Sequence, residues 1–112
     1  MDITFRDRKL EKTCNDFKQL QKAHGEKQAR KIRQRLDELH AADSLADISH
    51  LPPQRRHQLS GDRKGQFSVD VVFPYRLLFL PANNPLPLIE GGGLYLSKIT
   101  IILILGVEDT HE

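Results

Sequence analysis

The apolar residues in the first part of the chain repeat at helical spacing. One set is Leu10, Cys14, Phe17 and Leu20, and a second set, after Gly25, is Ala29, Ile32, Leu36 and Leu39. Each set falls on one face of a helix, with charged residues on most of the other faces. The spacing predicts two amphipathic helices joined at Gly25, an αα-hairpin whose apolar stripes pack on another layer.

The pattern changes to that of β-strands in the second half of the chain. Residues 3–5 and 55–59 are short β-prone pieces, and Phe67, Val69 and Val71 alternate with polar residues as in a half-buried strand. Residues 75–80 are apolar apart from Arg76, so this strand has neighbours on both sides. Residues 99–107 are rich in β-branched side chains and apolar on both faces, as in a central strand. The order β-α-α-β-β-β-β predicts an α+β fold, with the hairpin on one face of a small, mostly antiparallel sheet.

Three connections are informative. Gly61 and Gly65 bound a turn that holds Arg63 and Lys64, and Phe73 and Pro74 predict a tight reversal. Residues 81–96 are rich in proline, asparagine and glycine, which predicts a loop between strands. The glycine cluster in this loop is not a phosphate loop, because no Gly-Lys-Ser/Thr sequence follows it.

Length and composition predict a single domain over residues 1–112, with one modest core. No apolar stretch has the length of a signal peptide or of a bilayer span, so we expect a cytoplasmic protein. One cysteine excludes an internal disulfide, and its place on the apolar stripe predicts that Cys14 is packed in the core.

The net charge of +2 points to no particular partner, but the charge is unevenly distributed. Residues 1–64 hold 15 basic and 10 acidic residues, whereas residues 65–112 hold 2 basic and 5 acidic ones. A basic first part is typical of polyanion-binding proteins, although solvated helix faces explain most of these side chains.

Three features have the chemistry of a functional site. Arg76 interrupts an apolar strand, so it either marks the rim of a cleft or pairs internally with Asp62, Asp70 or Asp109, because an unpaired buried guanidinium is very costly. Arg63 and Lys64 are either functional cations or the ordinary charges of an exposed turn. His111 is either a proton carrier or an idle terminal residue.

Together these side chains could cleave RNA without a metal or another cofactor. Such cleavage needs a base for the 2′-OH proton, a cation for the charge on the phosphate and an acid for the leaving 5′-oxygen. The histidines and carboxylates have no metal-site spacing.

Three segments resemble one family. They are residues 57–69 with the sequence HQLSGDRKGQFSV, residues 75–77 with YRL, and residues 107–111 with VEDTH. The chain resembles, over essentially its whole length, the HigB branch of the RelE/ParE toxins, also called plasmid-maintenance killer or killer-suppression proteins. The resemblance implies a type II toxin–antitoxin toxin, an endoribonuclease that inhibits translation by cleaving mRNA on the ribosome. It further implies that a HigA-like helix-turn-helix antitoxin neutralises the toxin. Operator DNA would be bound by the antitoxin and by the toxin only through it.

The resemblance also assigns roles to residues. Arg63 and Lys64 would grip the RNA or ribosomal backbone, Arg76 would hold the scissile phosphate, and His111 would be the general acid or base. We further expect RNA contacts from the side chains of Arg55, Arg56, His57 and Tyr75. In the family a tyrosine often stands at the position of Thr110, so stacking on a base must come from elsewhere, with Tyr75 or Phe67 as candidates. The loop at residues 81–96 is longer than in short members.

Three other functions compete with this one. A ParE-like toxin would poison DNA gyrase without being an enzyme, but His111 with Arg63 and Arg76 favours the nuclease. A regulatory protein of a toxin–antitoxin operon would have a helix-turn-helix or a long disordered arm, and neither is recognisable. A general RNA-binding domain would have stacking aromatics on a basic sheet face, whereas aromatics are 6% of this chain.

Overall fold

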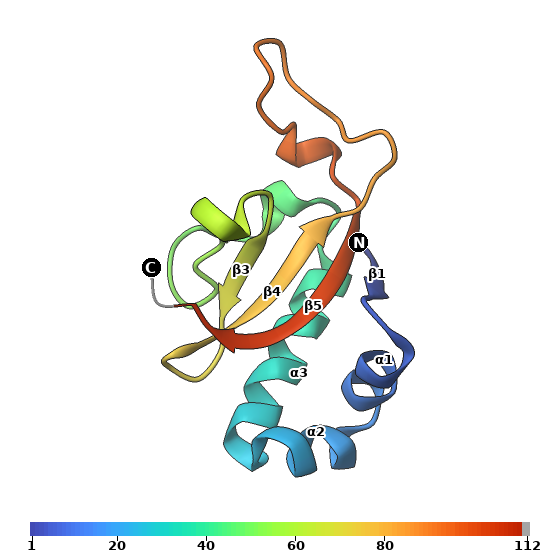
Figure 1. Ribbon diagram of the computed structural model, residues 1–112, viewed down its shortest axis with the longest axis vertical. Helices are drawn as coiled ribbons and strands as arrows, with labels where there is room; N and C mark the ends of the chain where they lie inside the picture. The colour runs from blue at the N-terminus through green and yellow to red at the C-terminus, as the bar shows by residue number, and fades with distance from the viewer. Residues whose placement is uncertain (111–112) are drawn as a thin grey trace.

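A computed structural model describes residues 1–110 of the chain. Within them, three α-helices and a five-stranded sheet form an α+β fold, as the sequence predicted (Figure 1). The helices are α1 (Arg8–Asn15), α2 (Phe17–His24) and α3 (Glu26–Ala41). The strands are β1 (Asp2–Phe5), β2 (His57–Gln58), β3 (Phe67–Asp70), β4 (Tyr75–Pro81) and β5 (Ile101–Asp109).

The sheet has the strand order β1-β5-β4-β3-β2. β1 runs parallel to β5, and the other neighbours are antiparallel, which confirms the mostly antiparallel sheet. The apolar segment at residues 99–107 was predicted to be a central strand, and β5 does lie between β1 and β4. The chain reverses tightly between β3 and β4 at Phe73 and Pro74, where Tyr75 N donates to Val72 O at 2.9 Å.

The predicted two-helix hairpin is wrong in one respect, because its first helix is broken at Asp16. This residue is extended (φ −126°, ψ 108°), and its carboxylate caps α2 by accepting from Lys18 N at 3.0 Å. The carbonyl oxygen of Cys14, near the C-terminal end of α1, accepts a hydrogen bond from Arg33 Nη1 of α3 at 2.7 Å. The break turns Phe17 outward, where it is 36% exposed, while Cys14 and Leu20 stay buried.

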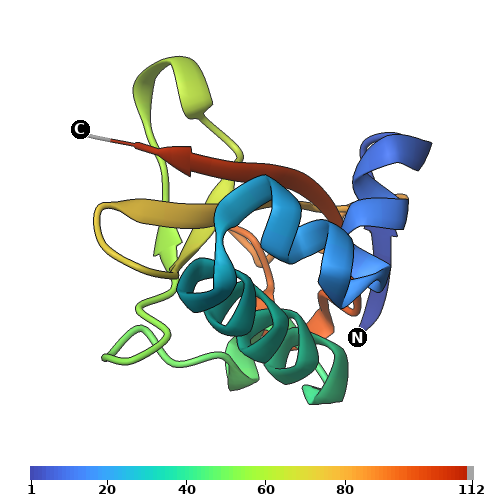
Figure 2. The same ribbon diagram turned by 90° about the horizontal axis from the view of Figure 1, so that it is seen from below.

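The helices cover one face of the sheet (Figure 2), and the core lies between them and that face. Cys14 belongs to it, as predicted, and so do Phe67 and Phe79, whose rings stack at a centroid distance of 5.9 Å. Burial of these apolar side chains is the main favourable term in folding. The opposite face of the sheet is free of α-helices (Figure 2). The candidate site lies on that face, where Arg76 is opposite Asp70 and Glu108.

The segment at residues 55–59 is a strand only at His57 and Gln58, so the predicted longer strand is wrong. Arg55 has a φ of 48°, a left-handed conformation that a strand does not allow. Residues 82–100 form an arm that projects beyond the end of the sheet (Figure 1), with a bridge between Leu88 and Leu94 and a 3-10 turn at Leu96–Lys98. None of the described helices is long and apolar enough to cross a membrane.

Candidate functional site

A row of charged side chains crosses the helix-free face of the sheet. In the strand register Arg76 of β4 lies opposite Asp70 of β3 on one side and opposite Glu108 of β5 on the other. Directly opposite residues on neighbouring strands project from the same face and interact. Arg76 therefore lies between two carboxylates, on the face that the helices leave uncovered.

Arginines from two loops extend this charged row. The carboxylate of Asp70 forms two ion pairs, with Arg76 Nε at 3.5 Å and with Arg55 Nη1 at 3.3 Å. Arg63, from the turn before β3, contacts Glu108 through two guanidinium nitrogens at 3.1 and 3.3 Å. Of the partners that the sequence offered for Arg76, the structure selects Asp70. The Arg76 side chain is 26% exposed, so these pairs are reachable by solvent and by a ligand.

One end of the charged row opens into a cleft of about 280 Å³. It is lined by Arg55, His57, Asp70, Val71, Phe73, Pro74, Tyr75, Arg76, Asp109 and Thr110. The two arginines and the two aspartates of this lining balance in formal charge. The cleft therefore combines paired guanidinium groups, an imidazole and exposed aromatic rings. Such a set can bind a nucleotide through both its phosphate and its base.

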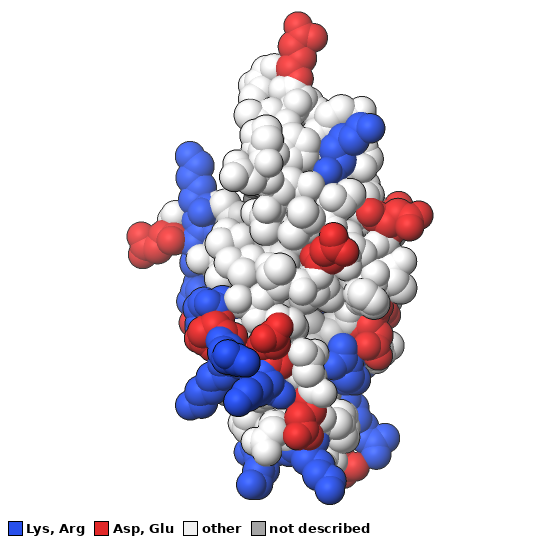
Figure 3. All heavy atoms as spheres, turned by 90° about the vertical axis from the view of Figure 1, so that its right-hand side faces the viewer, with Lys and Arg blue, Asp and Glu red and all other residues white. Residues whose placement is uncertain are grey.

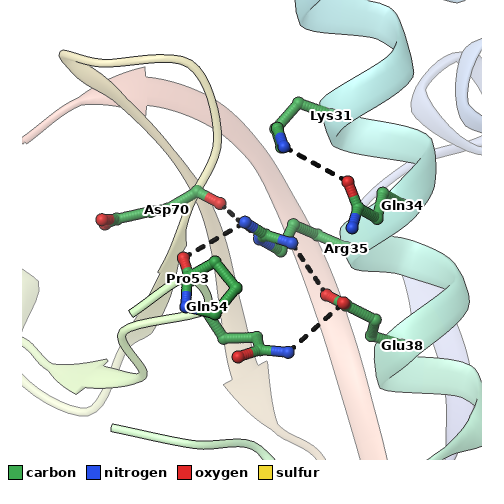
Figure 4. Close-up of polar contacts among 7 residues, drawn as sticks. All are labelled: Lys31, Gln34, Arg35, Glu38, Pro53, Gln54 and Asp70. Carbon is green, nitrogen blue, oxygen red and sulfur yellow. Dashed lines mark hydrogen bonds and ion pairs between the residues drawn. The ribbon is translucent and has the colours of Figure 1, made fainter. Parts of the chain in front are cut away.

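A buried arginine fixes the main chain behind this cleft (Figure 4). Arg35 of α3 is 3% exposed and donates to Asp70 O at 2.7 Å, to Pro53 O at 3.1 Å and to Glu38 at 2.9 Å. Glu38 also accepts from Gln54 at 3.2 Å. Arg35 therefore ties α3 to the end of β3 and to the loop before β2, which positions Asp70 and Arg55.

Four of the residues predicted from the sequence meet in the cleft, namely Arg55, His57, Tyr75 and Arg76. Arg63 joins the same charged row through Glu108, whereas Lys64 is exposed at the end of the 3-10 turn Gly61–Arg63 and is not part of the cleft lining. Arg56 also lies outside the lining, and its Nη1 donates to Leu45 O and Ile48 O, at 3.1 and 2.6 Å.

The two aromatic residues considered for stacking on a base differ in exposure. Phe67 is 2% exposed in the core and cannot stack on a substrate, so that alternative is wrong, whereas Tyr75 is 45% exposed and lines the cleft. Thr110 also lines the cleft but is buried. His111 lies outside the described residues.

Sequence reasoning missed several residues of this site. Glu108 and Arg35 were not recognised, because their roles depend on strand register and on α3 packing against a distant loop. Phe73 was recognised only as part of a reversal, although it lines the cleft. For Phe73 a signal did exist, since connections between strands run over the protein surface and Phe73 lies in one.

The basic first part of the chain forms no single basic surface in the view of Figure 3. There Lys and Arg side chains gather over the helices with Asp and Glu between them, and the arm above is mostly uncharged. Some arginines of the first part of the chain pair along α3, as Arg30 does with Glu26 at 2.8 Å and Arg33 with Asp37 at 3.0 Å. Within residues 1–110, no group of three or more His, Cys, Asp or Glu side chains could hold a metal ion.

The fold resembles that of a solved chain. A chain of the YoeB–YefM complex from Staphylococcus aureus superposes with a TM-score of 0.55 and 15% sequence identity, and the match covers 100% of this chain and 98% of that chain. Neither a family model nor a curated protein sequence matches the chain. At this identity the likeness establishes the fold, and this protein therefore shares the fold of the chain from the YoeB–YefM complex.

Proposed function

We propose that the protein is the toxin of a type II toxin–antitoxin module, an endoribonuclease that cleaves mRNA on the ribosome by acid–base chemistry without a metal. The observation that carries the proposal is the cleft in which Arg55, His57, Tyr75 and Arg76 meet on the helix-free face of the sheet. The shared fold with a chain of the YoeB–YefM complex and the resemblance to HigB-like toxins support the same assignment.

The proposed reaction begins with removal of the 2′-OH proton, after which the 2′-oxygen attacks the adjacent phosphorus and the 5′-oxygen leaves with a proton. Arg76 would hold the scissile phosphate and stabilise the charge that builds on it, because a guanidinium matches two phosphate oxygens. His111 would carry one of the two protons, since an imidazole can take or give a proton near neutral pH. It follows Thr110, which lines the cleft.

RNA would have to compete with carboxylates for these cations. The Arg76–Asp70 contact is 3.5 Å long and both side chains are about one-quarter exposed, at 26% and 24%. A long, partly exposed ion pair of this kind contributes little stability, so a phosphate can displace Asp70 at small cost. Arg63 would exchange Glu108 for backbone phosphate in the same way, Lys64 would add a further phosphate contact, and Arg55, Arg56 and His57 would bind flanking RNA.

The partners belong to the proposal as well. We infer a cognate antitoxin, since the chain with the same fold was solved in a complex of two proteins. A HigA-like helix-turn-helix antitoxin, operator DNA bound only through it, and a role in plasmid maintenance follow from the sequence resemblance. The proposed site of action is the cytoplasm, where the ribosome and mRNA are.

One observation favours a second candidate, a non-enzymatic ParE-like toxin that poisons DNA gyrase. Both arginines implied by the resemblance, Arg63 and Arg76, are paired with carboxylates in the structure. A cleft with balanced charge attracts RNA less than an unpaired cluster of arginines would. The deciding measurement is therefore the nature of the nucleic-acid damage in cells.

The test is induced expression followed by primer extension on one message, with and without its start codon. We expect growth arrest and cuts only in the translated message. Arg76→Ala and His111→Ala should abolish the cuts, whereas Arg30→Ala, which removes an exposed arginine of α3, should leave them unchanged. Full toxicity of both site variants would refute the site, and gyrase-linked DNA breaks without mRNA cuts would establish the alternative.

A further inference from the structure

Phe73 stands at the tip of the turn between β3 and β4. Among the described residues it is the most exposed large apolar side chain, at 87%. Single exposed apolar residues are common on protein surfaces, so exposure alone does not indicate a function. The position of Phe73 is more informative, because it lines the same cleft as Tyr75, Arg55 and Arg76.

The turn that presents Phe73 is held by hydrogen bonds on both sides. Within the turn, Tyr75 N donates to Val72 O at 2.9 Å and Val71 N donates to Tyr75 O at 3.3 Å. From α3, the amide of Gln28 accepts from Val72 N at 2.8 Å and donates to Val72 O at 3.4 Å. The backbone next to Phe73 is therefore anchored to a helix, so the turn that carries the ring loses little freedom when the ring binds a ligand.

The chemistry around Phe73 fits a nucleotide better than a protein surface. Sites for single-stranded nucleic acid combine aromatic rings, on which bases stack, with cations that track the phosphates. Here Phe73 and Tyr75 supply the rings, and Arg55 and Arg76 supply the cations in the same cleft. Aspartate is depleted in protein–protein interfaces, whereas Asp70 and Asp109 line this cleft together with the two rings.

We propose that Phe73 stacks on a nucleobase of single-stranded RNA and sets which part of the message enters the cleft, with Tyr75 as a second ring beside it. The proposal rests on the proposed function and adds the group that recognises the base next to the scissile phosphate. It also supplies the stacking that Thr110 cannot provide.

The first experiment uses the absence of tryptophan from this chain. Phe73→Trp introduces a single fluorophore at the tip of the turn. Leu51→Trp introduces one at another exposed position, outside the cleft lining, where Leu51 is 59% exposed. Each variant is titrated with a short single-stranded RNA oligonucleotide and with an abasic oligomer of the same length. We expect saturable quenching of the Phe73→Trp variant that requires the bases, and little change in the Leu51→Trp variant.

The second experiment measures cleavage of a translated message. Loss of one stacked base lowers binding on the order of ten-fold, so Phe73→Ala and the non-aromatic Phe73→Leu should cleave about ten-fold more slowly at limiting enzyme. Phe73→Tyr should remain close to wild type. Thermal unfolding by circular dichroism checks that all three variants fold, which is expected because the side chain contributes little to the core.

The outcomes separate this proposal from the proposed function. Base-dependent quenching without any mRNA cleavage by the wild type would end the nuclease assignment and keep Phe73 as an RNA contact. Wild-type cleavage by Phe73→Ala, or equal responses of the two tryptophan variants, would overturn the role of Phe73. A blue shift of the Phe73→Trp emission with the proposed cognate antitoxin, and none with RNA, would overturn it too, in favour of protein docking.

Discussion

Replacement of Arg35 by alanine should destabilise the protein strongly, although this arginine does not itself line the cleft. The guanidinium is 3% exposed and makes charged hydrogen bonds to two backbone carbonyls, Asp70 O and Pro53 O, and to Glu38. Removing one partner of a buried ion pair costs about 3–5 kcal/mol. Glu38 is 28% exposed and can be rehydrated, which favours the lower end, about 3 kcal/mol.

Urea unfolding followed by circular dichroism measures this loss. With a slope of about 1.3 kcal/mol/M for a domain of this size, a change of about 3 kcal/mol lowers the midpoint by about 2 M. The matched control is Arg30→Ala on the same helix, whose pair with Glu26 is 71% and 63% exposed. Such a pair contributes at most about 1 kcal/mol.

Arg35→Lys should be intermediate, because an ammonium keeps the charge but cannot reach three acceptors with one planar group. A midpoint shift for Arg35→Ala no larger than that for Arg30→Ala would refute the reasoning. It would mean that Asp70 and Pro53 are held in place without the arginine.

Three further predictions follow from the contacts of the structure. Asp70→Asn removes the charge that competes for Arg55 and Arg76, so the affinity for short single-stranded RNA should rise about two- to five-fold in fluorescence anisotropy, and unchanged affinity would contradict this. The pKa of Asp7 is lowered, chiefly because Leu10 N donates to its carboxylate and also because Arg6 is adjacent. Its stabilising effect is therefore present above the unfolded carboxyl pKa and is lost as the pH falls through the lower folded value. Asp7→Asn should consequently lose less stability than wild type between about pH 5 and about pH 3, as urea midpoints would show. Burial raises the pKa of the Cys14 thiol to about 11, so iodoacetamide should label it slowly in the native protein and rapidly in urea by mass spectrometry, and rapid native labelling would contradict its burial.

The sequence predicted the elements whose signal is local. Alternation of Phe67, Val69 and Val71 with polar residues identified β3, and the mostly apolar run at residues 75–80 identified an interior strand. Arg76 was recognisable because one charge in an apolar strand needs either a partner or a cleft, and it has both.

Other features depend on contacts that local patterns do not encode. The apolar residues from Leu10 to Leu20 keep a helical spacing across the break at Asp16, so the sequence pattern predicted one continuous helix. Asn15 and Asp16 are residue types that favour the start of a helix, and this capping signal was hidden by the regular spacing. The pairing of Arg63 with Glu108 spans 45 positions and exists only once the sheet has formed. Arg35 looked like another solvated charge of α3, because burial of one helix face against a distant loop is a tertiary event.

Glu108 lies on the same face of the sheet as Arg76 because the pairing of β5 with β4 shifts in register. The apolar sequence of β5 gave no sign of this shift. Leu78 lies opposite Gly106, but the next residue, Phe79, lies opposite Ile104, so β5 has one extra residue at this point. Because side chains alternate between faces, the extra residue reverses which face the end of β5 presents. Ile102 and Ile104 face the core before it, and Val107 packs against the core after it.

The same reversal creates the charged row. In a regular strand Glu108 would share a face with Ile104, toward the core, where an unpaired carboxylate is very costly. With the extra residue it lies opposite Arg76 and reaches Arg63. Gly106 has a φ of 142°, which other residues rarely adopt, so a glycine at this position permits the irregular backbone. The apolar face and the charged row of β5 are therefore compatible only because Leu105 is left out of the ladder, and the site depends on the backbone at Leu105 and Gly106 as much as on its arginines.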